Sequence, residues 1–285
     1  MSELRPVIRA MLWMSGALLS FMAMAIAGRE LSAELTTFQI LFFRSLIGLA
    51  VILVLLQRAG WWQVRTRSPG THLLRNVAHF GGQYGWFYGL GFIPLTEVFA
   101  IEFTVPIWTA ILATILLGER MNRLRALAIA MGFVGTLVIL RPGIAIVSPA
   151  AFAVLGSALA YAFSHTLTKR LSGTDPPLTI LFYMTAIQLP LGLVPALPGW
   201  VGPAAGSWPW VGVLATTALS AHYCMARAFR LADATVVMPM DFLRLPLIAL
   251  VGLAVYDEVL QIWVLVGAAI VFAAAWVNLK SARSG

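Results

Sequence analysis

Apolar runs of about twenty residues follow one another along almost the whole chain, and this is the length that a helix needs to cross a bilayer. Hydrophobic residues make up 60% of the 285 residues and charged residues only 11%. Soluble domains carry about twice this fraction of charged residues. We place ten spans, at residues 8–28, 36–56, 72–92, 94–117, 124–140, 149–168, 177–197, 208–228, 234–255 and 260–279.

The net charge of +8 follows the topology expected for such spans. Most of the 19 Lys and Arg lie before the first span, in the loops after spans two, four, six and eight, or in the C-terminal tail. Basic loops stay on the cytoplasmic side of a membrane. Both termini are therefore expected in the cytoplasm, and the positive charge does not indicate a nucleic-acid partner.

A stretch of the first half of the chain recurs in the second half. Each copy carries a carboxylate inside an apolar span, Glu102 or Asp241, and a proline shortly after it, Pro106 or Pro246. A charge at membrane depth is costly, and a proline within a span removes a helical hydrogen bond. Two such stretches at matching places indicate an internal duplication.

The duplication extends over most of the chain and divides it into two repeats, residues 1–143 and 144–285. Each repeat holds five spans, so the second copy must insert with the opposite orientation. The predicted fold is an all-α polytopic membrane protein, with ten transmembrane helices in a 5+5 inverted-topology repeat. Repeats of this kind build transporters whose substrate site lies near the midplane, between the two copies.

Several features together resemble the drug/metabolite transporter superfamily, EamA type. They are the two inverted repeats, an arginine inside span two (Phe43-Arg44-Ser45), the central prolines of spans four and nine, and the closing steps Gly118-Glu119 and Asp257-Glu258. The resemblance implies a secondary transporter of the bacterial inner membrane without a cofactor. It points first to amino-acid exporters, including the YddG-like aromatic amino-acid exporters. Uptake of a riboflavin-like or nucleoside-like metabolite is the alternative.

Span three combines polar side chains with small residues. His79 and Gln83 lie one helical turn apart, and Tyr84 follows directly. Gly81 and Gly85 belong to a glycine series that would let another backbone approach closely or let the helix bend. We expect His79, Gln83 and Tyr84 to contact the substrate, and the glycines to serve as hinges.

Three aromatic or imidazole side chains on other spans complete the expected substrate site: Trp108 in span four, Tyr161 in span six and His222 in span eight. Their rings would hold the apolar part of a metabolite. For a histidine inside the membrane, a hydrogen bond between packed helices is an equally good interpretation. Pro106 and Pro246 are expected to act as hinges beside this site.

Four charged side chains inside spans are expected to take part in coupling or gating: Arg44, Glu102, Asp241 and Arg244. Arg44 either meets a substrate carboxylate or forms an ion pair with one of the two acids. Arg244 lies three residues after Asp241, within reach on the same helix face. Glu102 has no basic neighbour at that spacing, so it is the better candidate for a group that takes up and releases a proton.

Three charges near the ends of spans are interpreted as structural. Arg75 is expected to extend its side chain to the cytoplasmic interface. Glu119 and Glu258 close spans four and nine. Both are expected to interact with the positive N-terminal ends of the spans that follow them.

The residue pattern does not indicate catalysis. The four histidines are scattered, a single cysteine offers no metal site, and no nucleophile–base or phosphate-binding pattern occurs. An intramembrane enzyme using Glu102 and His79 is the alternative from another class. The sequence favours a carrier in the lipid bilayer that moves a small-molecule substrate by alternating access. Protons are a candidate coupling ion, and the assembly is a monomer or a homodimer.

Overall fold

The computed structural model describes residues 4–117, 123–141, 148–171, 174–231 and 243–281. Every regular element within these ranges is a helix, so the all-α prediction is confirmed. In chain order the elements are α1 (Leu4–Leu31), α2 (Thr37–Ala59), η1 (Trp61–Val64), α3 (Pro69–Phe92), α4 (Leu95–Glu102), α5 (Val105–Leu117), α6 (Arg123–Leu140), α7 (Pro149–Leu171), α8 (Pro177–Ala196), η2 (Ala205–Ser207), α9 (Trp208–Leu231), α11 (Arg244–Tyr256) and α12 (Ile262–Ser281).

The helices fall at the positions of the ten expected spans. Within the described ranges, five segments are long and apolar enough to cross a membrane by composition alone: Ile8–Leu31, Thr37–Ala59, Leu95–Leu116, Pro149–Thr168 and Pro177–Ala196. Shorter apolar helices are Ala126–Leu140, Arg244–Tyr256 and Ile262–Val277. Helix α3 is less uniformly apolar because it carries Arg75, Asn76, His79 and Gln83 on a buried face.

The fourth span consists of two helices. Helix α4 ends at Glu102, and α5 begins three residues later. Pro106 lies in the first turn of α5, where the N–H that proline lacks would have had no helical partner. At the break the Thr104 hydroxyl donates a hydrogen bond to the Ile101 carbonyl at 2.7 Å. Pro246 similarly lies in the first turn of α11, and the eleven residues before Leu243, 232–242, fall outside the described ranges.

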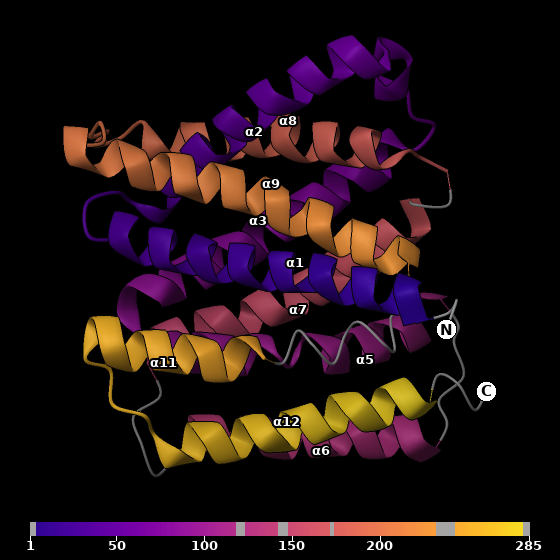
Figure 1. Ribbon diagram of the computed structural model, residues 1–285, viewed down its shortest axis with the longest axis vertical. Coiled ribbons are helices and arrows are strands. Elements are labelled where there is room, and N and C mark those ends of the chain that lie inside the picture. Colours follow the sequence, from indigo (N-terminus) through magenta and orange to yellow (C-terminus); the bar gives the residue numbers. More distant parts are fainter. Residues whose placement is uncertain (1–3, 118–122, 142–147, 172–173, 232–242, 282–285) are drawn as a thin grey trace.

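The two halves of the chain are interlocked, because each major helix pair takes one helix from each half. Helix α1 packs against α9, α2 against α8, α3 against α7, and α6 against α12, while α4 contacts α11. The helices lie side by side in Figure 1, with both chain termini at the right. We call this the terminal end of the bundle and the opposite end the distal end.

Helix α3 approaches the backbone of α7 through glycines. A Cβ at Gly85 would meet the Ala153 carbonyl group, and one at Gly89 would meet the Val154 side chain. Gly81, which the sequence placed in the same series, is exposed and has nothing within 4 Å of a Cβ position. The glycines that permit the contact are therefore Gly82, Gly85 and Gly89, and Gly81 is not part of it.

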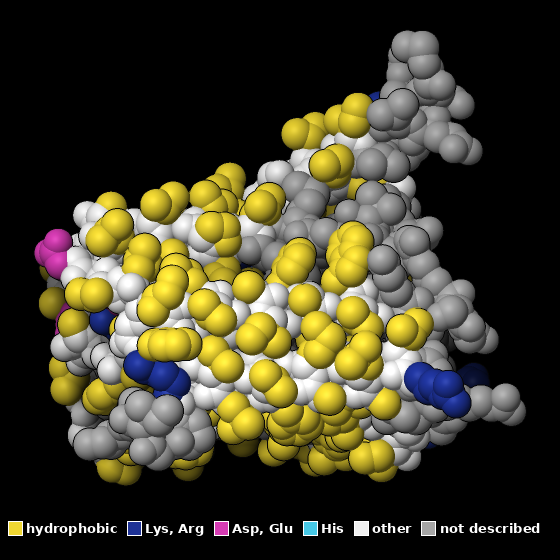
Figure 2. Space-filling view, turned by 90° about the horizontal axis from the view of Figure 1, so that it is seen from below, with side chains coloured by type: hydrophobic (Ala, Val, Ile, Leu, Met, Phe, Trp, Pro, Cys, Tyr) yellow, Lys and Arg dark blue, Asp and Glu magenta, His cyan; other side chains and the backbone are white. Residues whose placement is uncertain are grey.

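The surface has the distribution expected for contact with lipid. Figure 2 shows hydrophobic side chains across the visible face and charged side chains near its two ends. The paired helices α6 and α12 alone expose Leu127, Phe133, Val134, Leu137, Trp263, Val266, Phe272 and Trp276. Apolar faces of this size in a soluble monomer would be unusual, so they support a multi-pass membrane protein.

Candidate functional site

Polar side chains from five helices gather in the middle of the bundle. We call them the central polar cluster; its members are Arg44 (α2), Arg75, Asn76, His79 and Gln83 (α3), Tyr161 and His165 (α7), Gln188 (α8) and His222 (α9). On α3 these residues follow the helical spacing of three and four, so they share one face. The first half supplies five members and the second half four, which places the cluster between the repeats.

His79 is held in place by a side chain of the other half. The Gln188 amide Nε2 lies 2.9 Å from His79 Nδ1 and 3.5 Å from the Asn76 carbonyl oxygen. With the amide in this orientation Nε2 donates and Nδ1 accepts, so the imidazole is neutral and carries its proton on its own Nε2. The His79 ring lies 5.5 Å from the Tyr161 ring.

Several charged and imidazole groups lie near enough to His79 to interact with it electrostatically. The charges of Arg75 and Arg44 and the imidazoles of His222 and His165 all act on His79. Tyr161 in turn lies within the fields of Glu102, Arg44 and Arg244. Tyr161 is thus the cluster member that also lies near the Glu102–Arg244 pair.

His165 shows that the interior is open to solvent beside α7. Its side chain is exposed, although it lies on the side of α7 opposite the exposed Phe152 and Leu159. Its ring stacks with that of Tyr161 at 6.2 Å. Since Phe152 and Leu159 mark the lipid-facing side of α7, the exposure of His165 indicates space within the bundle.

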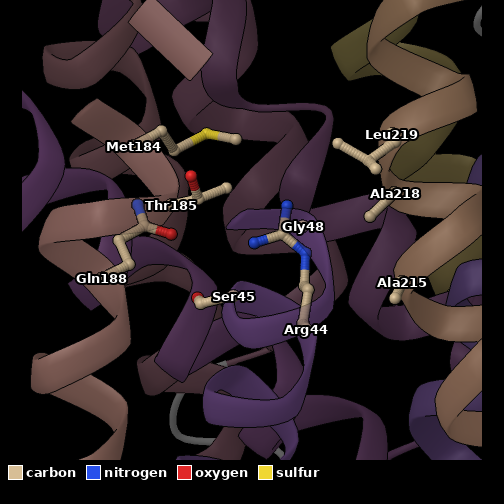
Figure 3. Close-up of a pocket in the computed structure, with 9 residues that line it drawn as sticks. All are labelled: Arg44, Ser45, Gly48, Met184, Thr185, Gln188, Ala215, Ala218 and Leu219. Atoms are coloured by element: carbon tan, nitrogen blue, oxygen red, sulfur yellow. The ribbon is translucent and has the colours of Figure 1, made fainter. Parts of the chain in front are cut away.

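A small cavity of about 10 Å³ adjoins Arg44, which is room for about one water-sized group. Figure 3 shows the Arg44 guanidinium between Thr185 and Gln188 of α8 on one side and Ala218 and Leu219 of α9 on the other. The remaining lining residues are Ser45, Gly48, Met184 and Ala215. The surface of the cavity is mostly apolar, and the Arg44 guanidinium is the charged group beside it.

Glu102 and Arg244 form an ion pair between the two halves, with 3.5 Å between Oε1 and Nη2. Trp86 Nε1 donates a further hydrogen bond to Glu102 Oε2 at 2.8 Å. The Arg244 guanidinium also lies 5.0 to 5.4 Å from the ring centres of Phe21, Phe99 and Phe103. Asp241, the partner expected for Arg244, lies outside the described residues. The acid that the structure pairs with Arg244 is Glu102, from the other half.

The distal end is closed by a group that we call the distal latch: Arg29, Glu258 and the start of α4. Glu258 Oε2 accepts a hydrogen bond from the Leu95 amide at 2.8 Å, and Oε1 lies 3.5 Å from Arg29 Nη2. Arg29 also donates to the carbonyl groups of Leu90 and Ile93. Glu258 therefore caps α4 of the first half, which corrects its expected interaction with the following span.

A second group, the terminal clasp, joins the halves at the terminal end. Asp175 Oδ2 lies 2.6 Å from His72 Nε2 and accepts a hydrogen bond from the Thr66 hydroxyl at 2.6 Å. Nearby, Thr179 donates to the Gln63 carbonyl group, and the Tyr183 hydroxyl donates to Val64 O at 3.1 Å. Contacts between the halves therefore exist on both sides of the central polar cluster.

Comparison with known proteins identifies the architecture. The model of the EamA-like transporter family matches the chain twice, over residues 8–141 and 148–280. The chain belongs to the EamA-like transporter family. This EamA-type chain is therefore a membrane transporter rather than an enzyme, and the inverted duplication is that of its family.

Relatives of this EamA-type transporter include proteins named for metabolites with fused heteroaromatic rings. The riboflavin transporter of Vibrio cholerae is 31% identical, over 97% of this chain and 96% of the relative. The S-adenosylmethionine uptake transporter of Rickettsia prowazekii is 25% identical, over 90% of this chain and 87% of the relative. A solved crystal structure with 17% identity shares the fold, with a TM-score of 0.67 over 96% of this chain and 98% of the other.

The structure places two of the expected substrate contacts away from the central polar cluster. The Tyr84 ring packs 4.6 Å from that of Phe38 on α2, on another side of α3 from His79. The Trp108 ring packs 5.3 Å from Phe133 on the peripheral helix α6.

Gln188 was not among the expected site residues. An amide inside an apolar span could have indicated it, because polar side chains inside a membrane are costly and often functional.

Arg75 also differs from its expected placement. Its side chain is buried, and it donates hydrogen bonds to the Thr168 hydroxyl at 3.0 Å and to Asn76 Oδ1 at 2.6 Å. It therefore does not extend to the membrane interface, because α7 supplies a partner inside the bundle.

No group of three His, Cys, Asp or Glu side chains in the described part of the chain is placed to bind a metal ion.

Proposed function

We propose that this transporter moves a heteroaromatic metabolite, of the riboflavin-like or nucleoside-like class, across the bacterial inner membrane. The observation that carries the proposal is the central polar cluster between the two repeats. Gln83 Oε1 and Asn76 Nδ2 are buried there without hydrogen-bond partners. Amide groups of this kind pair with the polar edges of bases such as adenine, and His79 and Tyr161 offer rings beside them.

Alternating access is the proposed mechanism. In this mechanism the two inverted repeats tilt against each other around a fixed central site. The distal latch and the terminal clasp are the proposed seals of the two sides, because each joins residues of one repeat to residues of the other. The basic loops and termini support a cytoplasmic location for the terminal end. Proton coupling, if the carrier uses it, is assigned to Glu102 and Arg244.

Uptake is the proposed direction. A protein named as an S-adenosylmethionine uptake transporter is similar to this chain over most of its length. Export of aromatic or other neutral amino acids is the narrower alternative. An amino acid would bind at the same cluster, but its ring has fewer polar atoms with which the unpartnered amides of Asn76 and Gln83 could form hydrogen bonds.

The test is uptake by the purified protein in liposomes, with radiolabelled S-adenosylmethionine, riboflavin and tryptophan as probes. Each probe is measured with and without an imposed pH gradient. We expect saturable uptake of one of the first two, reduced at least about tenfold by His79→Ala through loss of the polar contact. Val77→Ala, on the exposed side of the same helix, is the control and should leave uptake unchanged.

Each outcome separates the candidates. Tryptophan uptake without uptake of the other two would replace the proposal with amino-acid transport. Background uptake of all three by correctly folded protein would exclude both substrate classes. Equal loss of uptake in Val77→Ala and His79→Ala would show that the cluster has no special role.

A further inference from the structure

Arg44 is a buried cation without a protein counter-charge in the described part of the chain. Its side chain is only 5% exposed, and its Nε has no hydrogen-bond partner. The ion pairs found among the described residues join Arg29 to Glu258, His72 to Asp175, and Arg244 to Glu102, so none includes Arg44. Removing a charge from water without compensation is costly, and an ionisable side chain inside a membrane span marks a candidate functional site.

The surroundings of Arg44 make an acidic protein partner still less suitable. Arg75 lies near enough for the two like charges to act on each other. Arg75 is itself buried and hydrogen-bonded to neutral partners, Thr168 and Asn76. Among the described residues, the middle of the bundle therefore holds two positive charges, and Glu102, which lies near Tyr161, is already paired with Arg244.

The cavity beside Arg44 has room for one small group next to the guanidinium. Its lining residues include Ser45, Thr185 and Gln188, although the Thr185 hydroxyl donates to the Leu181 and Phe182 carbonyl groups of its own helix. Figure 3 shows the guanidinium directed between the two sides of this cavity. A volume of about 10 Å³ suits one terminal group and not a whole metabolite.

We propose that the Arg44 cavity is a subsite for a carboxylate carried by the transported molecule. A guanidinium presents parallel N–H donors that match the two oxygens of a carboxylate, and Ser45 adds a hydroxyl donor beside it. Gln188 links this subsite to the substrate ring, because its amide also contacts His79. The substrate is therefore a heteroaromatic metabolite that bears an acid group, such as an amino-acid side arm, and not a neutral ring compound.

This inference rests on the proposed function, and a matched pair of probes separates the two. S-adenosylmethionine and its decarboxylated form differ only in the carboxylate, and tryptophan and tryptamine differ in the same way. Uptake and thermal stabilisation by each probe are measured for the wild type, Arg44→Gln and Arg44→Lys. Arg58→Gln, an exposed arginine near the end of α2, is the control.

We expect the wild type to prefer the carboxylate form of a pair at least about tenfold, as for a charge-assisted hydrogen bond. In Arg44→Gln this preference should disappear, while uptake of the decarboxylated form is kept. Arg44→Lys should retain part of the preference, because lysine keeps the positive charge but lacks the two parallel N–H donors of the guanidinium. Arg58→Gln should behave as the wild type.

Three results would overturn the inference. The first is a full preference for the carboxylate form in a folded Arg44→Gln protein. The second is wild-type uptake of riboflavin with no preference in either pair, which leaves the proposed function standing and removes the subsite. The third is background uptake and no stabilisation with every probe, which removes the proposed function and the subsite together.

Discussion

Arg244 Nη2 and Glu102 Oε1 lie 3.5 Å apart, although the two residues belong to opposite repeats. Glu102 is the last residue of α4, and Arg244 is the first residue of α11. The pair therefore joins the C-terminal end of α4 to the N-terminal end of α11. Each of these two ends lies close to a proline. A conformational change that tilts one repeat against the other must move these two charges relative to each other.

Neutralising Glu102 should impair transport without preventing folding. In Glu102→Gln the amide oxygen can still accept the hydrogen bond from Trp86, but Arg244 faces a neutral group. Loss of one partner of a buried charge pair costs several kcal/mol, roughly 2–5, so we expect uptake in liposomes to fall at least about tenfold. Glu97→Gln, a partly buried acid of α4, is the control.

The coupling of the two charges can be measured separately. In a double-mutant cycle, Glu102→Gln with Arg244→Gln should lose less than the sum of the single variants, because they share one interaction. A proton-coupled carrier should also lose the pH dependence of its uptake in Glu102→Gln. An unchanged rate with an unchanged pH profile would remove Glu102 from the mechanism.

Glu258 of the distal latch should make the protein less stable as the pH rises. Burial raises the pKa of Glu258, against the opposing effects of the Leu95 amide and Arg29. The folded state then binds more protons than the unfolded state between the ordinary pKa of Glu and the raised value, so stability is lost as pH rises through this window.

Thermal unfolding of the wild type and Glu258→Gln, measured in detergent from about pH 4 to pH 7, tests the effect of Glu258. The amide of the variant still accepts from Leu95 but does not titrate. We expect the Tm of the variant to depend less on pH in this range. Parallel curves for the two proteins would contradict the assignment.

Asp175 of the terminal clasp should have the opposite pH dependence. Burial alone would raise the pKa of Asp175, but hydrogen bonds from Thr66 and His72 outweigh it and hold the pKa below its usual value. The stability that these bonds provide is therefore present above the ordinary pKa of Asp and is lost as the pH falls through the lowered value.

Asp175→Asn should lower stability at neutral pH by about 1–3 kcal/mol, a fall of several degrees in Tm, since hydrogen bonds to a charged acceptor are lost. Asp257→Asn is the control, because Asp257 is exposed and its left-handed backbone also suits asparagine. Equal Tm values for Asp175→Asn and the wild type would show that the clasp does not stabilise the fold.

Helix packing between the halves should be sensitive to Gly85 and insensitive to Gly81. In Gly85→Ala the new methyl group meets the Ala153 carbonyl of α7, so α3 and α7 must separate and Tm should fall by several degrees. Gly81→Ala adds a methyl group in open space and should be neutral or stabilising by up to about 1 kcal/mol. The reverse order of the two Tm values would contradict this packing.

Helical periodicity by itself separates some of the site residues from their neighbours. His79 and Gln83 are four residues apart and share a face of α3, whereas Tyr84 lies about 140° from His79 around the helix and packs against Phe38. The expected contact of Tyr84 with the substrate followed residue type and not helical position. Trp108 illustrates a different limit, because its partner Phe133 lies on α6, and no pattern in the sequence specifies that contact.

The sequence by itself determined the all-helical class and the duplication, and it set aside a nucleic-acid partner. These are local or statistical properties, because a bilayer requires each crossing segment to satisfy its own backbone hydrogen bonds and to be apolar. The tertiary structure decided which charge meets which. It pairs Glu102 with Arg244, caps α4 with Glu258, buries Arg75 against Thr168 and gives Arg44 no acidic partner among the described residues. Such pairings join segments far apart in the chain, and they depend on the packing of α3 on α7 and of α4 on α11.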